Sequence, residues 1–238
     1  RKYPLMLDYM RCMLEGKSLR ACANEVGICL KTSFEWRHKI LAAIRALEGG
    51  ISFSGIVEAD ELLMKYSEKG RKFKNKEEYQ RAKKKKHPKV AVLVVTDREG
   101  NILFKQVGEK KVKNEQLREE LKSRLSENNL ICVKPKKEFR KAVKSLQSKK
   151  VIVNKRQIKR GIYSVKIVEN KISDFKTWLS RFHGVATKYL QSYLMWFVIM
   201  NKYLKELIDP DIGRLLNLSS HDRWAWDKYR EIVSQRYD

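Results

Sequence analysis

In Gly55-Ile-Val-Glu-Ala-Asp-Glu-Leu62, one aspartate stands inside a segment that is otherwise typical of a buried β-strand. Asp60 occupies a position where such a strand normally carries an apolar residue. Much further on, Glu169 lies near the start of an amphipathic helix, and Lys176 follows two helical turns later on the same face. The interval 98–168 contains no aspartate. Asp60 and Glu169 are therefore two candidate acids of one site, with no aspartate in 98–168 to join them.

The residues that follow this stretch predict a mixed sheet covered by helices. Two more strands, at 89–96 and 102–107, are joined by the hairpin turn Asp97-Arg-Glu-Gly-Asn101. Strands and helices then alternate, which is typical of a mixed sheet flanked by helices. The further strands are expected at 130–133 and 151–154, and the helices at 114–126, 136–146, 173–181 and 187–207. Residues 65–87 are polar and very basic, so we expect a mobile loop there.

Residues 3–48 predict a helical region that precedes the sheet. Ser18 is a suitable N-cap for a helix over 19–26, and Gly27 supplies a tight turn before a second helix begins at Lys31. Helix, glycine turn and helix is the pattern of a helix-turn-helix, whose second helix enters the major groove by its N-terminal residues. The alternative is an ordinary helical hairpin. The residues expected to contact DNA are Lys31, Thr32, Ser33 and Arg37.

The sequence predicts an α+β, mixed organisation in three parts. Residues 1–50 form the helix-turn-helix DNA-binding region, and Gly49-Gly50 marks a linker. Residues 51–207 form the catalytic-type core. Residues 208–238 form a helical tail that carries Trp224, Trp226 and Tyr229.

The charge of the chain favours a polyanionic partner. Lys and Arg total 53 against 28 acids, giving +25. Neutralising phosphates releases condensed counterions, so such an excess favours nucleic acid over a merely solvated basic surface. In the basic loop, a run of lysines is expected to hold a phosphate backbone: Lys83, Lys84, Lys85 and Lys86. A basic RNA-associated scaffold is a remoter alternative.

The four cysteines predict neither a zinc ribbon within this chain nor a disulfide framework. Cys12, Cys22, Cys29 and Cys132 contain no C-x-x-C pair, so each is expected to be a small apolar residue in a reducing compartment. The apolar run near residues 193–200 is too short to cross a bilayer, and no membrane association is expected. Because the chain begins with arginine rather than methionine, an upstream segment is expected.

Several blocks of the sequence together carry a family resemblance. They are Ser18-Leu-Arg-Ala-Cys-Ala23, Thr32-Ser-Phe-Glu-Trp-Arg-His-Lys-Ile-Leu41, Gly55-Ile-Val-Glu-Ala-Asp-Glu61, Ser67-Glu-Lys-Gly70, Val92-Leu-Val-Val-Thr-Asp-Arg-Glu-Gly-Asn101, Trp178-Leu-Ser-Arg-Phe-His-Gly-Val-Ala-Thr-Lys-Tyr-Leu190 and Tyr193-Leu-Met-Trp-Phe197. The chain resembles the ISXO-type insertion-sequence transposases of bacteria, which belong to the DDE group. That family often has a zinc ribbon ahead of the helix-turn-helix, and this chain lacks one.

The resemblance implies an RNase H-like core with two carboxylates on adjacent strands and a third on a helix. Such a site holds two Mg²⁺ ions, which stabilise the attacking and leaving oxygens of the phosphodiester. Asp60 matches the first position and Glu169 the third, so these two are the expected metal ligands, within about 8 Å of each other. The family also carries a lysine at the position of Lys176, which is therefore assigned to the catalytic site.

The second position departs from the family. Where the family places aspartate after a short strand, this chain has Lys134, directly after 130–133. Its ammonium is expected to lie between Asp60 and Glu169 as a salt bridge and to repel a dication. Glu138 is the nearby acid that could substitute, although its place on a helix would aim it elsewhere.

The resemblance and the missing aspartate together predict an impaired transposase. It would bind double-stranded DNA at terminal inverted repeats for Mg²⁺-dependent strand cleavage and transfer, with catalysis reduced by the lysine. The alternative is a catalytically dead, sequence-specific DNA-binding protein derived from a transposase. The expected location is the bacterial cytoplasm, associated with the nucleoid, and a homodimer on DNA is compatible with this function.

Overall fold

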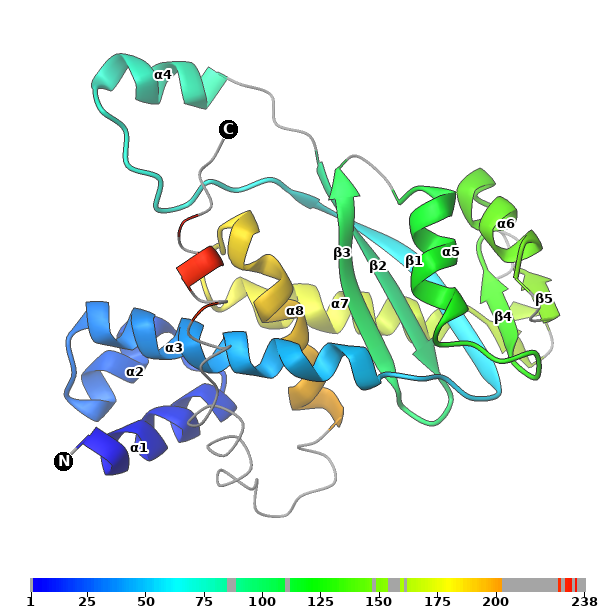
Figure 1. The fold of residues 1–238 in the computed structure, drawn as a ribbon, viewed down its shortest axis with the longest axis horizontal. Coiled ribbons are helices and arrows are strands. Elements are labelled where there is room, and N and C mark those ends of the chain that lie inside the picture. Colours follow the sequence, from blue (N-terminus) through cyan, green and yellow to red (C-terminus); the bar gives the residue numbers. More distant parts are fainter. Residues whose placement is uncertain are drawn as a thin grey trace.

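The centre of the molecule is a five-stranded mixed sheet with the order β3-β2-β1-β4-β5 (Figure 1). The computed structural model describes residues 2–84, 89–109, 112–146, 149–153, 159–160, 162–202, 227, 230–232 and 234. The strands are β1 (Ile56–Lys65), β2 (Lys89–Asp97), β3 (Ile102–Glu109), β4 (Leu130–Val133) and β5 (Lys149–Ile152), with a separate hairpin of β6 (Lys159–Arg160) and β7 (Tyr163–Ser164). The predicted mixed sheet is confirmed.

The pairing of the strands is RNase H-like. β1, β2 and β3 form an antiparallel meander, and β4 and β5 continue the sheet in parallel with β1. β2 is buried at every position after its first residue, because helices cover both faces of the sheet. The register pairs Ala59 of β1 with Val133 of β4. The residue that follows β4 therefore emerges beside Asp60.

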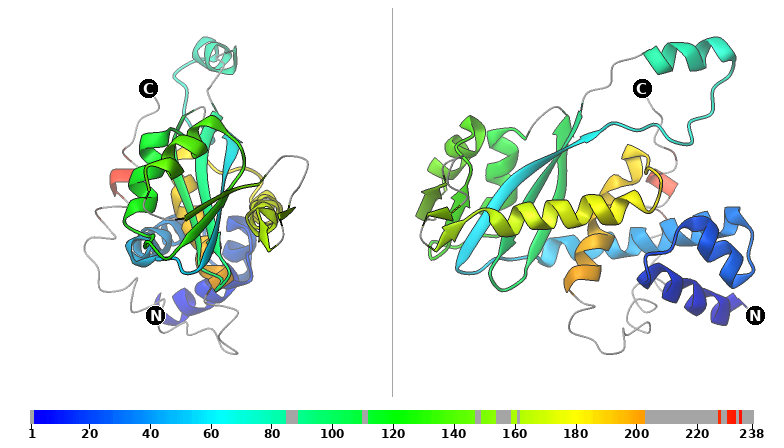
Figure 2. Two further views of the ribbon diagram at one scale, coloured as in Figure 1. Left: turned by 90° about the vertical axis from the view of Figure 1, so that its right-hand side faces the viewer. Right: turned by 180° about the vertical axis from the view of Figure 1, so that it is seen from behind.

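Helices lie on both faces of this sheet. α5 (Asn114–Lys122) and α6 (Lys137–Lys144) lie on one face and α7 (Lys166–Ser180) on the other (Figure 2). α7 contacts β1 and β2 and buries Phe175 completely. The Phe175 ring lies 5.1 Å from that of Phe104 on β3. This packing holds α7, and the acid near its start, against the sheet.

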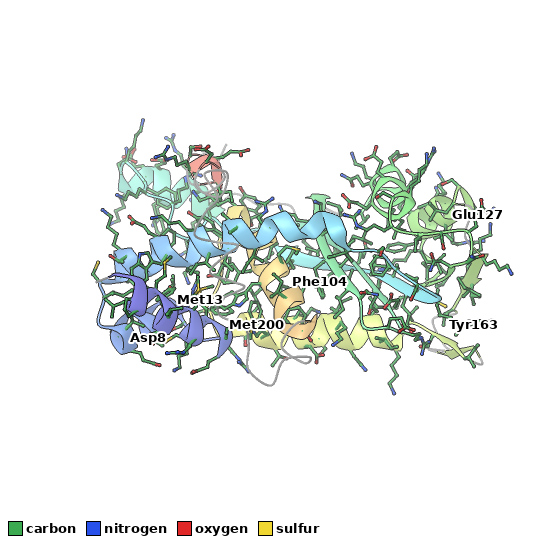
Figure 3. All side chains as sticks on the ribbon, turned by 60° about the horizontal axis from the view of Figure 1, so that its bottom comes forward. Asp8, Met13, Phe104, Glu127, Tyr163 and Met200 are labelled. Atoms are coloured by element: carbon green, nitrogen blue, oxygen red, sulfur yellow. The ribbon has the colours of Figure 1, made fainter. Side chains whose placement is uncertain are left out.

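A second long helix, α8 (Thr187–Lys202), covers the open edge of the sheet at β3. Gln191 of α8 donates to the Phe104 carbonyl at 3.1 Å and accepts the N–H of Gln106 at 2.7 Å. Phe104, labelled in Figure 3, also packs edge-on against Phe197, with 5.5 Å between the ring centroids. The glutamine satisfies edge groups that would otherwise pair with another chain.

The N-terminal helices pack onto α8 through α3. They are α1 (Lys2–Leu14), α2 (Leu19–Val26) and α3 (Leu30–Ile44), followed by the 3₁₀ helix η1 (Arg45–Gly50). Ser18 caps α2 by accepting the Ala21 N–H, and Gly27 ends it in the left-handed region at φ 70°. The predicted helix, glycine turn and helix are confirmed as elements. The division of the chain at residue 50 stays a prediction.

Two helices differ from the predictions. α4 (Lys76–Lys84) lies within the predicted loop and projects from the body (Figure 1). It buries no side chain, so no apolar periodicity marked it; acids in its first turn and bases in its last favour it through the helix dipole. α7 begins seven residues before the predicted start at Ser173, and Asn154 and most of the predicted tail fall outside the described residues. No helix within the described ranges combines the length and apolar composition needed to span a bilayer.

Candidate functional site

Asp60 lies on the central strand of the sheet and is buried. The residue is only 4% exposed, and its Oδ1 accepts the N–H of Glu61 at 2.8 Å. A buried carboxylate is costly unless ionic or hydrogen-bonding partners compensate it. The parallel register of β1 and β4 supplies such a partner from the segment after β4.

Lys134 provides the first compensating charge. Its Nζ lies 2.6 Å from Oδ2 of Asp60 and 2.5 Å from Oε1 of Glu169. The two carboxylate oxygens are therefore at most about 5 Å apart, the sum of those two distances. The predicted convergence of Asp60, Lys134 and Glu169 is present, and the lysine ammonium lies between the acids as expected.

Lys136 provides a second ammonium that the sequence analysis did not include. Its Nζ lies 2.9 Å from Oδ1 of Asp60 and 3.0 Å from Oε1 of Glu61. The chain turns tightly between the two lysines, because the Lys136 N–H donates to the Lys134 carbonyl at 2.7 Å. Each oxygen of Asp60 therefore has its own ammonium.

Glu58 positions the helix that carries Glu169. It lies two residues before Asp60 on β1 and is 1% exposed. Its Oε2 accepts the N–H groups of Ile167 and Val168 at 2.8 and 3.1 Å, and its Oε1 accepts the Ser164 hydroxyl at 2.9 Å. α7 has no side-chain cap of its own. The carboxylate of Glu58 thus accepts hydrogen bonds from the first amides of α7, and its negative charge interacts favourably with the positive end of the helix dipole.

The electrostatics of the cluster follow from burial and charge. Burial alone would raise the pKa of Asp60, but the hydrogen bonds from Lys134 and Lys136 outweigh it and hold that pKa below its ordinary value. Burial alone would lower the pKa of Lys134, but its hydrogen bonds to Asp60 and Glu169 raise it. The stabilisation from this pair is therefore present between the two ordinary pKa values. It is lost below the lowered pKa of Asp60 and above the raised pKa of Lys134.

We expect Lys134→Met to lower the free energy of unfolding by about 2 kcal/mol at neutral pH, because it leaves two acids with one ammonium fewer. The difference from the natural chain should shrink as pH falls from the ordinary Asp pKa of 3.8 towards the lowered pKa of folded Asp60, because the unfolded chain binds this proton first. Urea unfolding at a series of pH values measures this. Lys137→Met removes an exposed lysine as a control. A difference that stays constant down to pH 2 would contradict the assignment of the pair.

Magnesium does not fit this arrangement. The DDE resemblance implies a dication between Asp60 and Glu169, and the ammonium of Lys134 lies there instead. In the part of the chain that the structure describes, no three His, Cys, Asp or Glu side chains gather so as to hold a metal ion. The predicted ligand pair is thus close together, but its charge is already compensated by lysine.

The comparisons with known proteins identify the family of the chain. The model of the ISXO2-like transposase domain matches residues 52–199, more than half of the chain. The chain belongs to this family of DDE transposases. The comparison with curated proteins gives no match. The crystal structure of a pre-cleavage Mos1 transpososome is 9% identical with a TM-score of 0.37, covering 93% of this chain and 76% of that chain. No feature is transferred from a similarity this low.

In this transposase-family chain, Lys176 lies outside the ion-pair cluster. It is exposed on α7, seven residues and so about 10 Å along the helix from Glu169. Among the described residues it makes no ion pair with an acid. Its catalytic assignment stays a prediction from the family.

Two of the predicted DNA contacts need correction. Ser33 and Arg37 are both 0% exposed, so neither side chain reaches solvent. The Ser33 hydroxyl donates to the Leu19 carbonyl at 2.8 Å, and Arg37 donates to the Lys17 carbonyl at 2.8 Å. The Arg37 guanidinium also stacks over Trp196, with 5.1 Å to the ring centroid. Both residues hold α3 in place, and the prediction that their side chains contact DNA is wrong.

The other predicted DNA contacts lie at the surface where they are described. Lys31 is exposed and Thr32 half-buried in the first turn of α3, and Lys83 and Lys84 are exposed at the end of α4. Lys85 and Lys86 lie outside the described residues. DNA binding by this set stays a prediction.

A sequence signal existed for one of the two residues missed at the site. Glu58 and Asp60 share one face of a strand, because side chains alternate at period two. Glu58 was therefore recognisable in the sequence as an unusual second acid on the same strand face as Asp60. Lys136 gave no such signal, because it is one basic residue among many in 134–144.

Proposed function

We propose that this chain is a transposase-family protein that binds duplex DNA at element ends and whose strand cleavage is impaired. The observation that carries the proposal is the position of Lys134 Nζ, 2.6 Å from Asp60 and 2.5 Å from Glu169. An ammonium repels a cation about 4 Å away by about 4 kcal/mol per unit of its charge at an effective dielectric near 20. Divalent ions are thus disfavoured at the position where the family's chemistry needs them.

The second candidate is a DNA-binding protein that has lost catalysis altogether. Lys136 favours it, because this second ammonium holds the remaining oxygen of Asp60 and the carboxylate of Glu61. Replacing Lys134 alone would free only Oδ2 of Asp60, because Lys136 would still hold Oδ1. The candidates differ in whether replacing these lysines recovers activity.

The charge of the chain supports the DNA-binding part of the proposal. An excess of 25 positive charges favours phosphate contacts, and the family acts on DNA. The expected target is the terminal inverted repeat, bound by a homodimer in the bacterial cytoplasm near the nucleoid. The exposed lysines of α4 and the first turn of α3 are candidates for the contact.

We expect duplex binding to weaken steeply between 50 and 200 mM salt, because each phosphate contact contributes about −0.9 to the slope of log K against log salt. Lys31→Gln with Thr32→Ala should reduce the preference for element ends over random duplex by about tenfold, the order of one specific base contact. Fluorescence anisotropy on both duplexes measures this. Lys122→Gln with Ser123→Ala, an exposed Lys and hydroxyl residue at the C-terminal end of α5, is the control. Salt-independent affinity, or equal losses on both duplexes, would remove the role of α3.

A further inference from the structure

The outer face of α6 is basic and has no acidic partners. Phe139, Ala142 and Val143 face the core and are buried. The opposite side carries four exposed cations: Lys137, Arg140, Lys141 and Lys144. Among the described residues, none of these four has a carboxylate within 4.0 Å. The positive charge of this helix face is therefore not compensated by carboxylates, whereas Lys134 and Lys136 are ion-paired with Asp60.

Two adjoining hollows give this face its shape. One, of about 250 Å³, is lined by Pro135 and the four cations of α6. The other, of about 270 Å³, lies between β4, α6 and β5 and adds Lys150. Arg140 and Lys144 line both hollows. The two hollows therefore adjoin at Arg140 and Lys144, and we call the strip of cations from Lys137 to Lys150 the basic track. No acid lines either hollow, and the other residues lining the second are three valines and an isoleucine.

The dimensions of the track suit a run of phosphates. From Lys137 to Lys144 the helix rises about 10.5 Å, and one DNA strand carries a charge about every 3.4 Å of axis. The face thus spans about three successive phosphates. No aromatic side chain lines either hollow, so the track lacks the stacking surfaces that hold unpaired bases. These features favour the backbone of a duplex over a single strand.

The track also lies beside the acid cluster. Lys134, Pro135 and Lys136 lead directly from β4 into α6, and both lysines are paired with Asp60. α6 and β5 lie at the end of the molecule opposite to α1 and α2 (Figure 1). A duplex bound here would pass the carboxylates without needing the N-terminal helices.

We infer that the face formed by Lys137, Arg140, Lys141, Lys144 and Lys150 binds the phosphate backbone of duplex DNA. This inference rests on the proposed DNA binding and assigns it to a surface other than α3. The binding is independent of base sequence, because phosphates carry no sequence information. This face then positions DNA next to the acid cluster, which Lys134 closes to divalent ions.

The neighbouring helix α5 supplies a matched control. It also exposes basic residues at Arg118 and Lys122, with Lys113 just before it. Unlike the outer face of α6, the exposed surface of α5 also carries the acids Glu115 and Glu119, which would repel phosphate. Removing three positive charges from either helix changes the net charge equally.

The test compares Arg140→Gln/Lys141→Gln/Lys144→Gln with Lys113→Gln/Arg118→Gln/Lys122→Gln in the full chain, titrated onto a random-sequence DNA duplex. We expect the α6 variant to lose at least about tenfold in affinity near 100 mM salt, and its salt slope to fall by about 2 to 3. The α5 variant should lose less than about threefold, since it changes only the long-range field. Glutamine keeps helix propensity, and circular dichroism checks the fold.

Each outcome decides the inference. Equal losses in the two variants, or none in the α6 variant, overturn it while leaving DNA binding by the natural chain intact. No DNA binding by the natural chain removes the proposed function as well. If the α6 variant loses more affinity for duplex RNA than for duplex DNA, the face belongs to RNA and the inference is wrong. Should a triple variant misfold, Lys141→Glu against Arg118→Glu makes the same comparison with one charge reversal on each helix.

Discussion

Replacing Lys134 with aspartate is expected to create a divalent-cation site that the natural chain does not have. The change removes the ammonium between Asp60 and Glu169 and adds a third carboxylate. Hard cations prefer such an oxygen cluster. At a Mn²⁺ concentration about 100 times the dissociation constant, the free energy of unfolding should rise by about 2.7 kcal/mol. The natural chain should show no such rise. Calorimetric titration and thermal unfolding with Mn²⁺ or Mg²⁺ measure both.

Lys113→Asp is the control for this change, because it makes the same substitution at an exposed position outside the cluster. Mn²⁺ stabilisation of the same size in Lys113→Asp would mean that the ion binds the surface at large. Stabilisation of the natural chain by Mn²⁺ through Asp60, lost on Asp60→Ala, would contradict the reading of Lys134 as a block.

Recovery of DNA cleavage needs a second change. Lys136 holds the other oxygen of Asp60 at 2.9 Å, so Lys134→Asp alone leaves one ammonium on that carboxylate. We expect no cleavage of element-end DNA by the natural chain with Mg²⁺ or Mn²⁺. Nicking should appear first in Lys134→Asp/Lys136→Gln and vanish when Asp60→Ala is added. Lack of nicking in the double variant would favour the candidate without catalysis. If the natural chain cleaves and Asp60→Ala stops it, Glu138 becomes the acid to test.

Glu58→Ala is expected to have the largest effect on stability. The change deprives the amides of Ile167 and Val168 and the Ser164 hydroxyl of their buried acceptor. Loss of a helix cap costs about 1 kcal/mol and an unsatisfied buried donor about 1–3 kcal/mol. We therefore expect a loss of about 3 kcal/mol in the free energy of unfolding, measured by urea denaturation. Amide hydrogen exchange at 167 and 168 should accelerate, because the start of α7 is released.

Glu99→Ala, which removes an exposed acid from the β2–β3 turn, is the control and should be nearly neutral. Glu58→Gln keeps one acceptor oxygen and should fall between the two. Equal stability of Glu58→Ala and Glu99→Ala would show that Glu58 does not hold α7. Unchanged exchange at 167 and 168 despite lost stability would place the effect elsewhere in the sheet.

The positions of the two acids and of Lys134 between them were predictable, because all three belong to a motif with a defined order along the chain. Asp60 on a strand, a residue after the next parallel strand and Glu169 on a helix follow from the family pattern, and their convergence is present. Glu58 stands out only as a second acid on the strand face of Asp60, and its role as the cap of a distant helix has no local signature. Its hydrogen-bond donors Ser164, Ile167 and Val168 lie 106 to 110 residues away in the sequence, and Arg98, whose guanidinium is 3.2 Å from its Oε1, lies 40 residues away.

The assignment of α3 went wrong for a related reason. Helical periodicity shows which residues share a face, but it does not show what covers that face. Arginine is a common DNA-contacting residue, yet Trp196 of α8 packs over the guanidinium of Arg37. Ser33 likewise faces Tyr9 of α1, whose hydroxyl lies 2.9 Å from its Oγ. Charge and position in a motif therefore overestimated the exposed part of the helix.

Residue identity and local periodicity suffice to give the charge of the chain, the strand with Asp60, the helix with Glu169 and the lysine in place of a carboxylate. Packing between distant segments is what brings Lys136 beside Lys134 on Asp60 and buries one side of α3. Those contacts join residues 74 and 76 positions apart at the acid cluster. An ammonium and a carboxylate form an ion pair only when N and O lie within about 4 Å, and only the folded backbone sets such a distance.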